Sequence, residues 1–219
     1  MIVIVTGAPG AGKGTQSDLL SARCGFKKLS TGDALRKHVR LGTSIGKVAG
    51  AVMEKGQLVS DDLLLQVLGE ELKGFSRSDV VLLDGYPRNL GQAKALEGLG
   101  GSHKIAAVLH LDVDRGELVG RLSGRRVCGG CGATFHVLEN PSRVDGVCDK
   151  CGGSLEQRPD DRSESVAVRL DVYEKTTMPI LEFYRAKGLY FRVDGKGTPE
   201  EIYSRLMERM RGLELAHGL

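Results

Sequence analysis

Four cysteines in the second half of the chain have the spacing of a metal site. Cys128 and Cys131 form one C-x2-C pair, and Cys148 and Cys151 form a second pair 16 residues later. Two such pairs can meet as four thiolates around one tetrahedral Zn²⁺. Four protein ligands leave no position for a substrate, so the spacing predicts a structural zinc. Iron or disulfides at the same thiols, and a zinc ribbon that binds nucleic acid, are the alternatives that the spacing leaves open.

A second motif predicts phosphate binding near the N-terminus. Residues 7–13 read G-A-P-G-A-G-K and match G-x-x-x-x-G-K between an apolar run and a helical pattern. The backbone N–H groups of such a loop wrap a phosphate, and its lysine, here Lys13, reaches the β- and γ-phosphates of a nucleotide. The hydroxyl that usually follows the lysine and binds Mg²⁺ comes one position later, at Thr15. Direct contact of Thr15 with the metal is therefore left open.

A carboxylate and a guanidinium follow another apolar run. Asp84 ends the run at residues 80–83, where a carboxylate beside a phosphate loop commonly serves Mg²⁺ through water; a helix cap before Asn89 is the alternative. Arg88 comes four residues later and could hold a phosphate with two parallel hydrogen bonds. Between them, Gly85 permits close backbone approach and Pro87 stiffens the turn.

The elements that must position these groups alternate along the chain. Four short apolar runs have the composition of buried parallel strands: residues 2–5, 80–83, 105–111 and 189–193. Helical patterns lie between them at residues 13–23, 61–73, 89–99 and 114–121, and a last helix opens at Thr198-Pro199. This order predicts a three-layer α/β fold.

Two segments interrupt the alternation and are expected to be insertions. Residues 30–60 are helical and polar, and residues 127–157 are rich in Gly and Cys but poor in apolar side chains. A piece of about 30 residues needs a metal or disulfides to be ordered. After the second insertion, Asp161 and Glu164 are spaced as a capping box that starts a long helix, which Pro179 should kink or replace by a new helix.

Composition excludes several classes of protein. The chain has 219 residues, 41% of them hydrophobic and 27% charged, which is too apolar for a disordered protein. A net charge of +3 and only 5% aromatic residues do not fit a dedicated nucleic-acid binder. No apolar run approaches the ~18 residues of a membrane span, and the first residues do not resemble a signal peptide, so we expect a cytoplasmic protein without membrane or nucleic-acid partners.

Taken together, the motifs resemble those of the adenylate kinases. They are residues 7–15 (G-A-P-G-A-G-K-G-T), 29–33 (L-S-T-G-D), 84–88 (D-G-Y-P-R), 124–126 (G-R-R) and 158–161 (R-P-D-D), in the family's order and spacing. The resemblance implies the reaction ATP + AMP ⇌ 2 ADP with Mg²⁺, in a monomer with a P-loop NTPase fold and the zinc-containing long lid of many bacterial members. It implies a core of residues 1–29, 60–121 and 160–219, an AMP-binding insertion at 30–59 and a lid at 122–159.

The resemblance also implies roles for individual residues. ATP contacts map to Gly10, Ala11, Gly12, Lys13, Gly14, Thr15, Arg121, Arg125, Thr134, Phe135 and Gly197. AMP contacts map to Thr31, Arg36, Gln57, Leu58, Val59, Gly85, Arg88, Gln92, Arg158 and Arg169. The residues implied in catalysis are Lys13, Arg88, Arg121, Arg125, Arg158 and Arg169, with Asp84 and Thr15 near Mg²⁺. A related kinase with another acceptor or donor base, and a nucleotide-dependent switch that binds RNA, are the alternatives.

Overall fold

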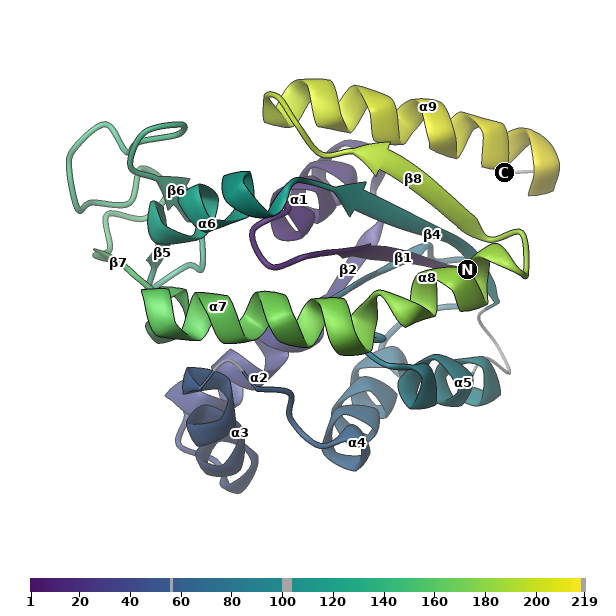
Figure 1. Cartoon of the computed structure of the whole chain (residues 1–219), viewed down its shortest axis with the longest axis horizontal. Coiled ribbons are helices and arrows are strands. Elements are labelled where there is room, and N and C mark those ends of the chain that lie inside the picture. The colour runs from purple at the N-terminus through teal and green to yellow at the C-terminus, as the bar shows by residue number, and fades with distance from the viewer. Residues whose placement is uncertain (56, 100–103, 218–219) are drawn as a thin grey trace.

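The central sheet of the computed structural model has five parallel strands in the order β2-β3-β1-β4-β8 (Figure 1). The structure describes residues 1–55, 57–99 and 104–217. The strands are β1 (Ile2–Gly7), β2 (Lys27–Ser30), β3 (Val81–Asp84), β4 (Ile105–Asp112) and β8 (Tyr190–Asp194). Because the strands are parallel, the loops that follow β1 and β3 leave the same edge of the sheet, which is where ligands bind in open α/β folds.

Helices cover both faces of this sheet (Figure 1). They are α1 (Lys13–Cys24), α2 (Thr31–Arg40), α3 (Ser44–Glu54), α4 (Asp61–Leu72), α5 (Leu90–Leu99), α6 (Arg115–Ser123), α7 (Ser163–Val172), α8 (Pro179–Arg185) and α9 (Pro199–His217). A 3₁₀ turn, η1 (Pro159–Asp161), precedes α7, and a π-helical turn, η2 (Tyr173–Thr177), joins α7 to α8.

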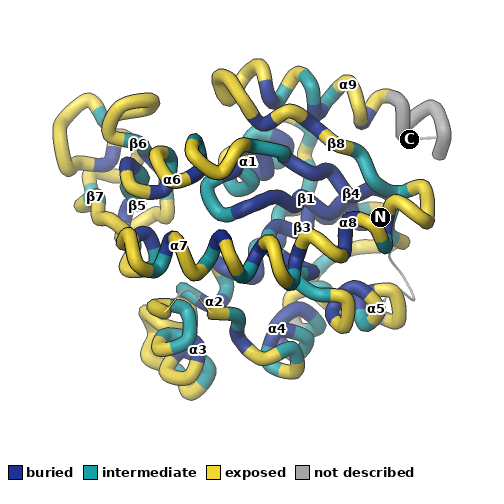
Figure 2. The backbone as a smooth tube through the Cα atoms, viewed as in Figure 1, coloured by how far each residue is buried: buried dark blue, intermediate teal, exposed yellow. Residues whose placement is uncertain are grey.

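Alternate side chains of β1 divide the core into two layers. Val3 and Val5 pack with residues of α1, α6, α7 and α9, whereas Ile2 and Ile4 pack with residues of α2, α4, α5 and α8. All six residues of β1 are buried, as expected of a central strand covered on both faces (Figure 2). The sheet is therefore a rigid platform for the loops at its edge.

A second, smaller sheet lies at one end of the molecule, next to α6 and α7 (Figure 1). It is antiparallel, in the order β6-β5-β7, with strands β5 (Arg125–Cys128), β6 (Thr134–His136) and β7 (Leu155–Glu156). Its core contains Phe135 and the thiols of Cys128 and Cys148. So small a core fits the expectation that this segment depends on a metal.

The predicted strands and helices are confirmed to within two residues at each end, and the three-layer α/β class is correct. Strand β2 was not predicted, because two of its four residues are lysines and only Leu29 is buried. The predicted capping box is wrong: Arg162 occupies the cap position of α7, and the Asp161 carboxylate contacts arginines instead. Pro179 begins a new helix, one of the two expected outcomes.

Candidate active site

A cavity of about 290 Å³ opens beside the loops that follow β1 and β3. Its wall is built from the phosphate loop, α1, α2, the segment after β3, the small sheet, and the loop before α9. Eight basic side chains, each from a different segment of the chain, also line it: Lys13, Lys28, Arg36, Arg88, Arg121, Arg125, Arg158 and Arg169. Residues far apart in the sequence thus form one cationic cavity.

The phosphate loop takes the conformation that its glycines permit. Gly10 and Gly12 have φ angles of +85° and +89°, in the left-handed region that side chains with a Cβ avoid. Gly12 is the N-cap of α1, so the first N–H groups of that helix face the cavity side of the loop. The ammonium of Lys13 donates to the carbonyl oxygens of Gly7 and Ala8, both at 2.9 Å. The loop and its lysine form a preformed anion site.

The segment after β3 lies beside this loop. Asp84 pairs in register with Val5 of β1, is only 8% exposed, and lines the cavity. The Nε of Arg88 donates to the carbonyl oxygen of Gly85 at 2.7 Å, and the Thr31 hydroxyl donates to the same oxygen at 3.1 Å. The Arg88 guanidinium is therefore aimed back across the segment into the cavity.

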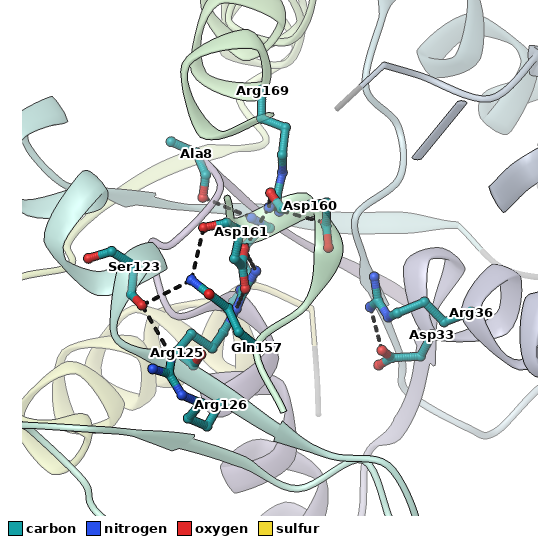
Figure 3. Close-up of polar contacts among 11 residues, drawn as sticks. Ala8, Asp33, Arg36, Ser123, Arg125, Arg126, Gln157, Asp160, Asp161 and Arg169 are labelled. Carbon is teal, nitrogen blue, oxygen red and sulfur yellow. Dashed lines mark hydrogen bonds and ion pairs between the residues drawn. The ribbon is translucent and has the colours of Figure 1, made fainter. Parts of the chain in front are cut away.

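Two arginines from distant parts of the sequence share one buried carboxylate. Asp161 is 1% exposed. Its oxygens accept from Nε and Nη2 of Arg125, at 2.7 and 2.5 Å, and from Nη1 of Arg169, at 2.8 Å. Arg169 also pairs with Asp160 at 3.1 Å. Figure 3 shows these contacts, which join the start of β5 to α7 and fix both guanidinium groups.

A third acid lies on the α2 side of the cavity. Asp33 pairs with Arg36 at 2.5 Å (Figure 3) and with Lys28 at 3.8 Å. Burial alone would raise the pKa of the Asp33 carboxyl, but Arg36 and Lys28 outweigh it and hold this pKa at about 2. Asp33 and Asp84 both line the cavity. Carboxylate oxygens of this kind suit Mg²⁺ and its water ligands, so the residues present fit the metal that accompanies a nucleotide.

The remaining cations are poorly compensated. Burial lowers the pKa of Lys13 to about 7, although Asp84 opposes the change. Burial and neighbouring arginines lower the pKa of Arg88 to about 10 and that of Arg158 to about 9. The Nε of Arg158 is buried without a hydrogen-bond partner among the described residues. A cavity whose cations repel each other stabilises bound anions.

The four cysteines converge in the small sheet. Their sulfur atoms all lie within 4.8 Å of one another. The Sγ atoms of Cys128 and Cys151 are 3.4 Å apart, and those of Cys131 and Cys148 are 3.6 Å apart, so the thiols are free. Ligands about 2.3 Å from a tetrahedral Zn²⁺ stand about 3.8 Å from each other. The four thiols therefore fit one tetrahedral zinc ion.

Comparison with known proteins agrees with this geometry. The adenylate kinase family profile matches residues 5–189. The adenylate kinase of Caldanaerobacter subterraneus subsp. tengcongensis is 42% identical over 216 residues, which cover 97% of each chain. Those of Geobacillus sp. and Methanocella arvoryzae are 42% and 41% identical and are covered over their full length. The chain belongs to the adenylate kinase family. It is therefore an enzyme of reversible phosphoryl transfer between adenine nucleotides.

Most residues that the family resemblance implied line this cavity. They are Gly10, Gly12, Lys13, Gly14, Thr15, Arg36, Asp84, Gly85, Arg88, Arg121, Arg125, Thr134, Phe135, Arg158, Arg169 and Gly197. Leu58 lines an adjoining cavity of about 90 Å³ that shares Lys13 and Arg88 with the first.

Five implied residues line neither cavity: Ala11, Thr31, Gln57, Val59 and Gln92. Ala11, Thr31, Val59 and Gln92 are buried, and Gln57 is exposed.

No sequence pattern indicated that Asp33 and Asp161 pair with arginines, and the spacing of Asp161 predicted only a helix cap. Asp33 is the last residue of the L-S-T-G-D motif and Asp161 is the last residue of the R-P-D-D motif. Their place in these motifs was the sequence signal that could have identified them as site residues. Arg121 pairs with Glu117 and donates to the carbonyl oxygen of Gly195 at 3.0 Å. It thus lies beside the loop that contains Gly197, on the side where the family resemblance places ATP.

Proposed function

We propose that the enzyme transfers the γ-phosphoryl group of Mg-ATP to AMP, chiefly by alignment and charge compensation. The observation that carries the proposal is the cationic cavity, in which burial and neighbouring arginines lower the pKa values of Lys13, Arg88 and Arg158. Two nucleotides would supply compensating negative charge. Phosphoryl transfer needs positioning and electrostatic stabilisation more than covalent chemistry from the protein.

The two substrates would enter from opposite sides. The phosphate loop and Lys13 hold the β- and γ-phosphates of the donor, and Arg88 with Arg36 holds the phosphate of the acceptor. Arg125 and Arg169, fixed by a common carboxylate, neutralise charge that develops on the transferred group. Mg²⁺, bound near Asp84, supplies charge neutralisation on the donor phosphates and their orientation. No general base is required for this division of roles.

The small sheet would act as a lid over the donor. Thr134 and Phe135 of this sheet line the cavity wall, and Phe135 also packs in the core formed by Cys128 and Cys148. We expect structural Zn²⁺ at the four cysteines to keep this segment folded while it moves. A closed lid would exclude water, which otherwise competes with AMP for the γ-phosphoryl group.

The proposal includes the division into a core, an AMP-binding insertion at residues 30–59 and a lid at 122–159. Supporting it, α2 and α3 lie to one side of the central sheet and the small sheet lies at its end (Figure 1). Among the described residues, no helix has the length and apolar character needed to cross a membrane. We propose a cytoplasmic monomer, which size-exclusion chromatography with light scattering would test for oligomeric state.

The test is nucleotide conversion followed by chromatography. Purified enzyme with Mg-ATP is incubated with AMP, UMP, CMP or GMP in separate reactions. Rapid formation of ADP with AMP alone supports the proposal. Conversion of another monophosphate in preference to AMP would contradict the acceptor assignment, and hydrolysis of ATP without transfer to any acceptor would contradict the reaction.

A further inference from the structure

The side-chain amide of Gln92 accepts a hydrogen bond through its oxygen and donates one through its nitrogen, to two different neighbours. Gln92 is in the first turn of α5 and has no exposed surface. Its Oε1 accepts from the backbone N–H of Arg88 at 2.6 Å, and its Nε2 donates to Oδ1 of Asp61 at 2.6 Å. These two contacts join α5 to the first residue of α4 and to the segment that carries Arg88.

The two partners fix which way round the amide stands. A backbone N–H only donates and a carboxylate only accepts. Rotating the Gln92 amide by half a turn would place its NH₂ group against the Arg88 N–H and its oxygen against the Asp61 carboxylate. Both hydrogen bonds would then be replaced by repulsive contacts, and the carboxylate contact is the stronger of the two because it is charge-assisted. Asp61 thus holds the amide in one orientation.

Asp61 is itself held in place. Both of its oxygens accept from Nδ2 of Asn89, at 3.0 and 3.1 Å. Oδ1 of Asn89 accepts from the backbone N–H of Gln92 at 2.8 Å, which closes a ring of three side chains. The carbonyl oxygen of Arg88 accepts from the Thr177 hydroxyl at 2.8 Å. The carboxylate and the N–H that orient the amide are therefore both fixed by further contacts.

The Gln92 amide has one N–H and one oxygen lone pair left for a ligand, and their relative positions are fixed by the orientation of the amide. A primary amide has two N–H bonds and two lone pairs on oxygen, and one of each is used by Arg88 and Asp61. A 6-aminopurine offers an acceptor at N1 and a donor at the 6-position, and a 6-oxopurine offers the reverse at the same two atoms. An amide with a fixed orientation can match only one of these patterns for a base held in one pose.

We propose that Asp61 is the positioning residue that makes the acceptor site select a 6-aminopurine over a 6-oxopurine, by fixing the orientation of the Gln92 amide. This inference rests on the proposed function, in which AMP is the acceptor and Gln92 meets its base. Because Gln92 is fully covered here, a base reaches it only after the residues over it have moved. Asp61 does not touch the base: it acts through Gln92.

The test compares AMP with IMP, which differs from AMP only in the pattern at N1 and the 6-position. In Asp61→Asn, the new amide can donate as well as accept, so a reversed Gln92 no longer meets a repulsive group there. We expect the ratio of kcat/KM for AMP to that for IMP to fall at least tenfold, mainly through KM. Asp62→Asn is the matched control, since Asp62 is the next residue and is exposed. It should change the ratio less than twofold.

General damage to the site would lower kcat/KM for both acceptors in parallel, and that outcome would overturn the inference, as would an unchanged ratio. Asp61→Ser, which can also donate or accept, provides a second variant should Asp61→Asn fail to show a thermal unfolding transition. If the unaltered enzyme converts no AMP, the proposed function and this inference both fall. If it converts AMP and neither variant lowers the ratio of kcat/KM for AMP to that for IMP, only this inference is refuted.

Discussion

Replacing Asp161 by Asn should lower kcat far more than replacing an exposed acid near the same helix. The carboxylate is 1% exposed and accepts three hydrogen bonds from the guanidinium groups of Arg125 and Arg169. An asparagine keeps one oxygen, so it keeps some of these bonds, but its NH₂ group then faces a guanidinium donor. Arg125 then loses its carboxylate partner, and Arg169 keeps only its contacts with Asp160.

The magnitude follows from these contacts. A hydrogen bond to a charged group contributes roughly 1.5–3 kcal/mol, and breaking a buried ion pair on one side costs ~3–5 kcal/mol. Because the amide retains part of the contact, we expect a loss of about 3 kcal/mol in the free energy of unfolding. For a chain of this size that lowers Tm by roughly 6–12 °C. Arginine contacts in phosphoryl transfer contribute ~10³–10⁵ in rate, so a loss of about 10² or more in kcat is expected.

The assay measures ADP formation at saturating ATP and AMP, with thermal unfolding followed by circular dichroism. Asp171→Asn is the matched control, because Asp171 is also an acid that pairs with an arginine, Arg115, at 2.7 Å, but both side chains are about half exposed. Exposed pairs contribute ~0–1 kcal/mol, so this variant should keep nearly full activity. An Asp161→Asn enzyme with lowered Tm but unchanged kcat would refute the reasoning, since Asp161 would then stabilise the fold without positioning catalytic groups.

Three further predictions concern the metal, the phosphate loop and pH. Cys148→Ser should lower the zinc content and the amide-exchange protection of the lid while β1 and β4 stay protected; uniform protection throughout would contradict a structural zinc. Since burial lowers the pKa of Lys13 to about 7, ATP binding at pH 8 should take up protons, visible by calorimetry as an enthalpy that depends on the buffer; release of protons would contradict it. Burial lowers the pKa of His110 to about 4, so stability should be full above pH 6.5 and fall by about 3 kcal/mol as pH drops toward 4. His110→Gln should weaken this pH dependence of the free energy of unfolding, measured by urea unfolding. An unchanged pH dependence would show that His110 does not cause it.

Much of the fold could be predicted because its signals are local. The strand at residues 2–5 and the phosphate loop after it are recognised from adjacent residues alone, and the structure extends that strand only to Gly7. Strand β2 escaped prediction because it lies at the edge of the sheet, where two lysines remain partly exposed and the apolar signal is one residue, Leu29. The order of strands, which brings β2 beside β3, depends on contacts that no local pattern encodes.

The site was predicted unevenly for the same reason. Cations in the motifs were identified, but their pairing with acids was not, because a motif gives residue types and spacing and does not give side-chain contacts. Asp161 was taken for a helix cap from its spacing to Glu164, whereas its partner Arg125 is 36 residues away. Gln92 was expected to present its amide to a base, and the structure places both ends of that amide against protein groups. A local pattern names the residue type and leaves its partners unspecified.

The acids divide the cations of the site into two groups with different tasks. Arg125 and Arg169 are held by Asp161 without any nucleotide present, so under the proposed mechanism they would need no reorganisation during transfer. Among the described residues, Lys13 and Arg158 have no such ion pair. Burial lowers their pKa values, so a bound phosphate would favour their charged forms. If all these cations were paired with carboxylates, the cavity would have little affinity for nucleotides; if none were, the lid and core would repel each other across it. Under the proposed division into lid and core, the buried Asp161 would hold Arg125 of the small sheet to Arg169 of α7, and the charges of Lys13 and Arg158 would remain for the phosphates.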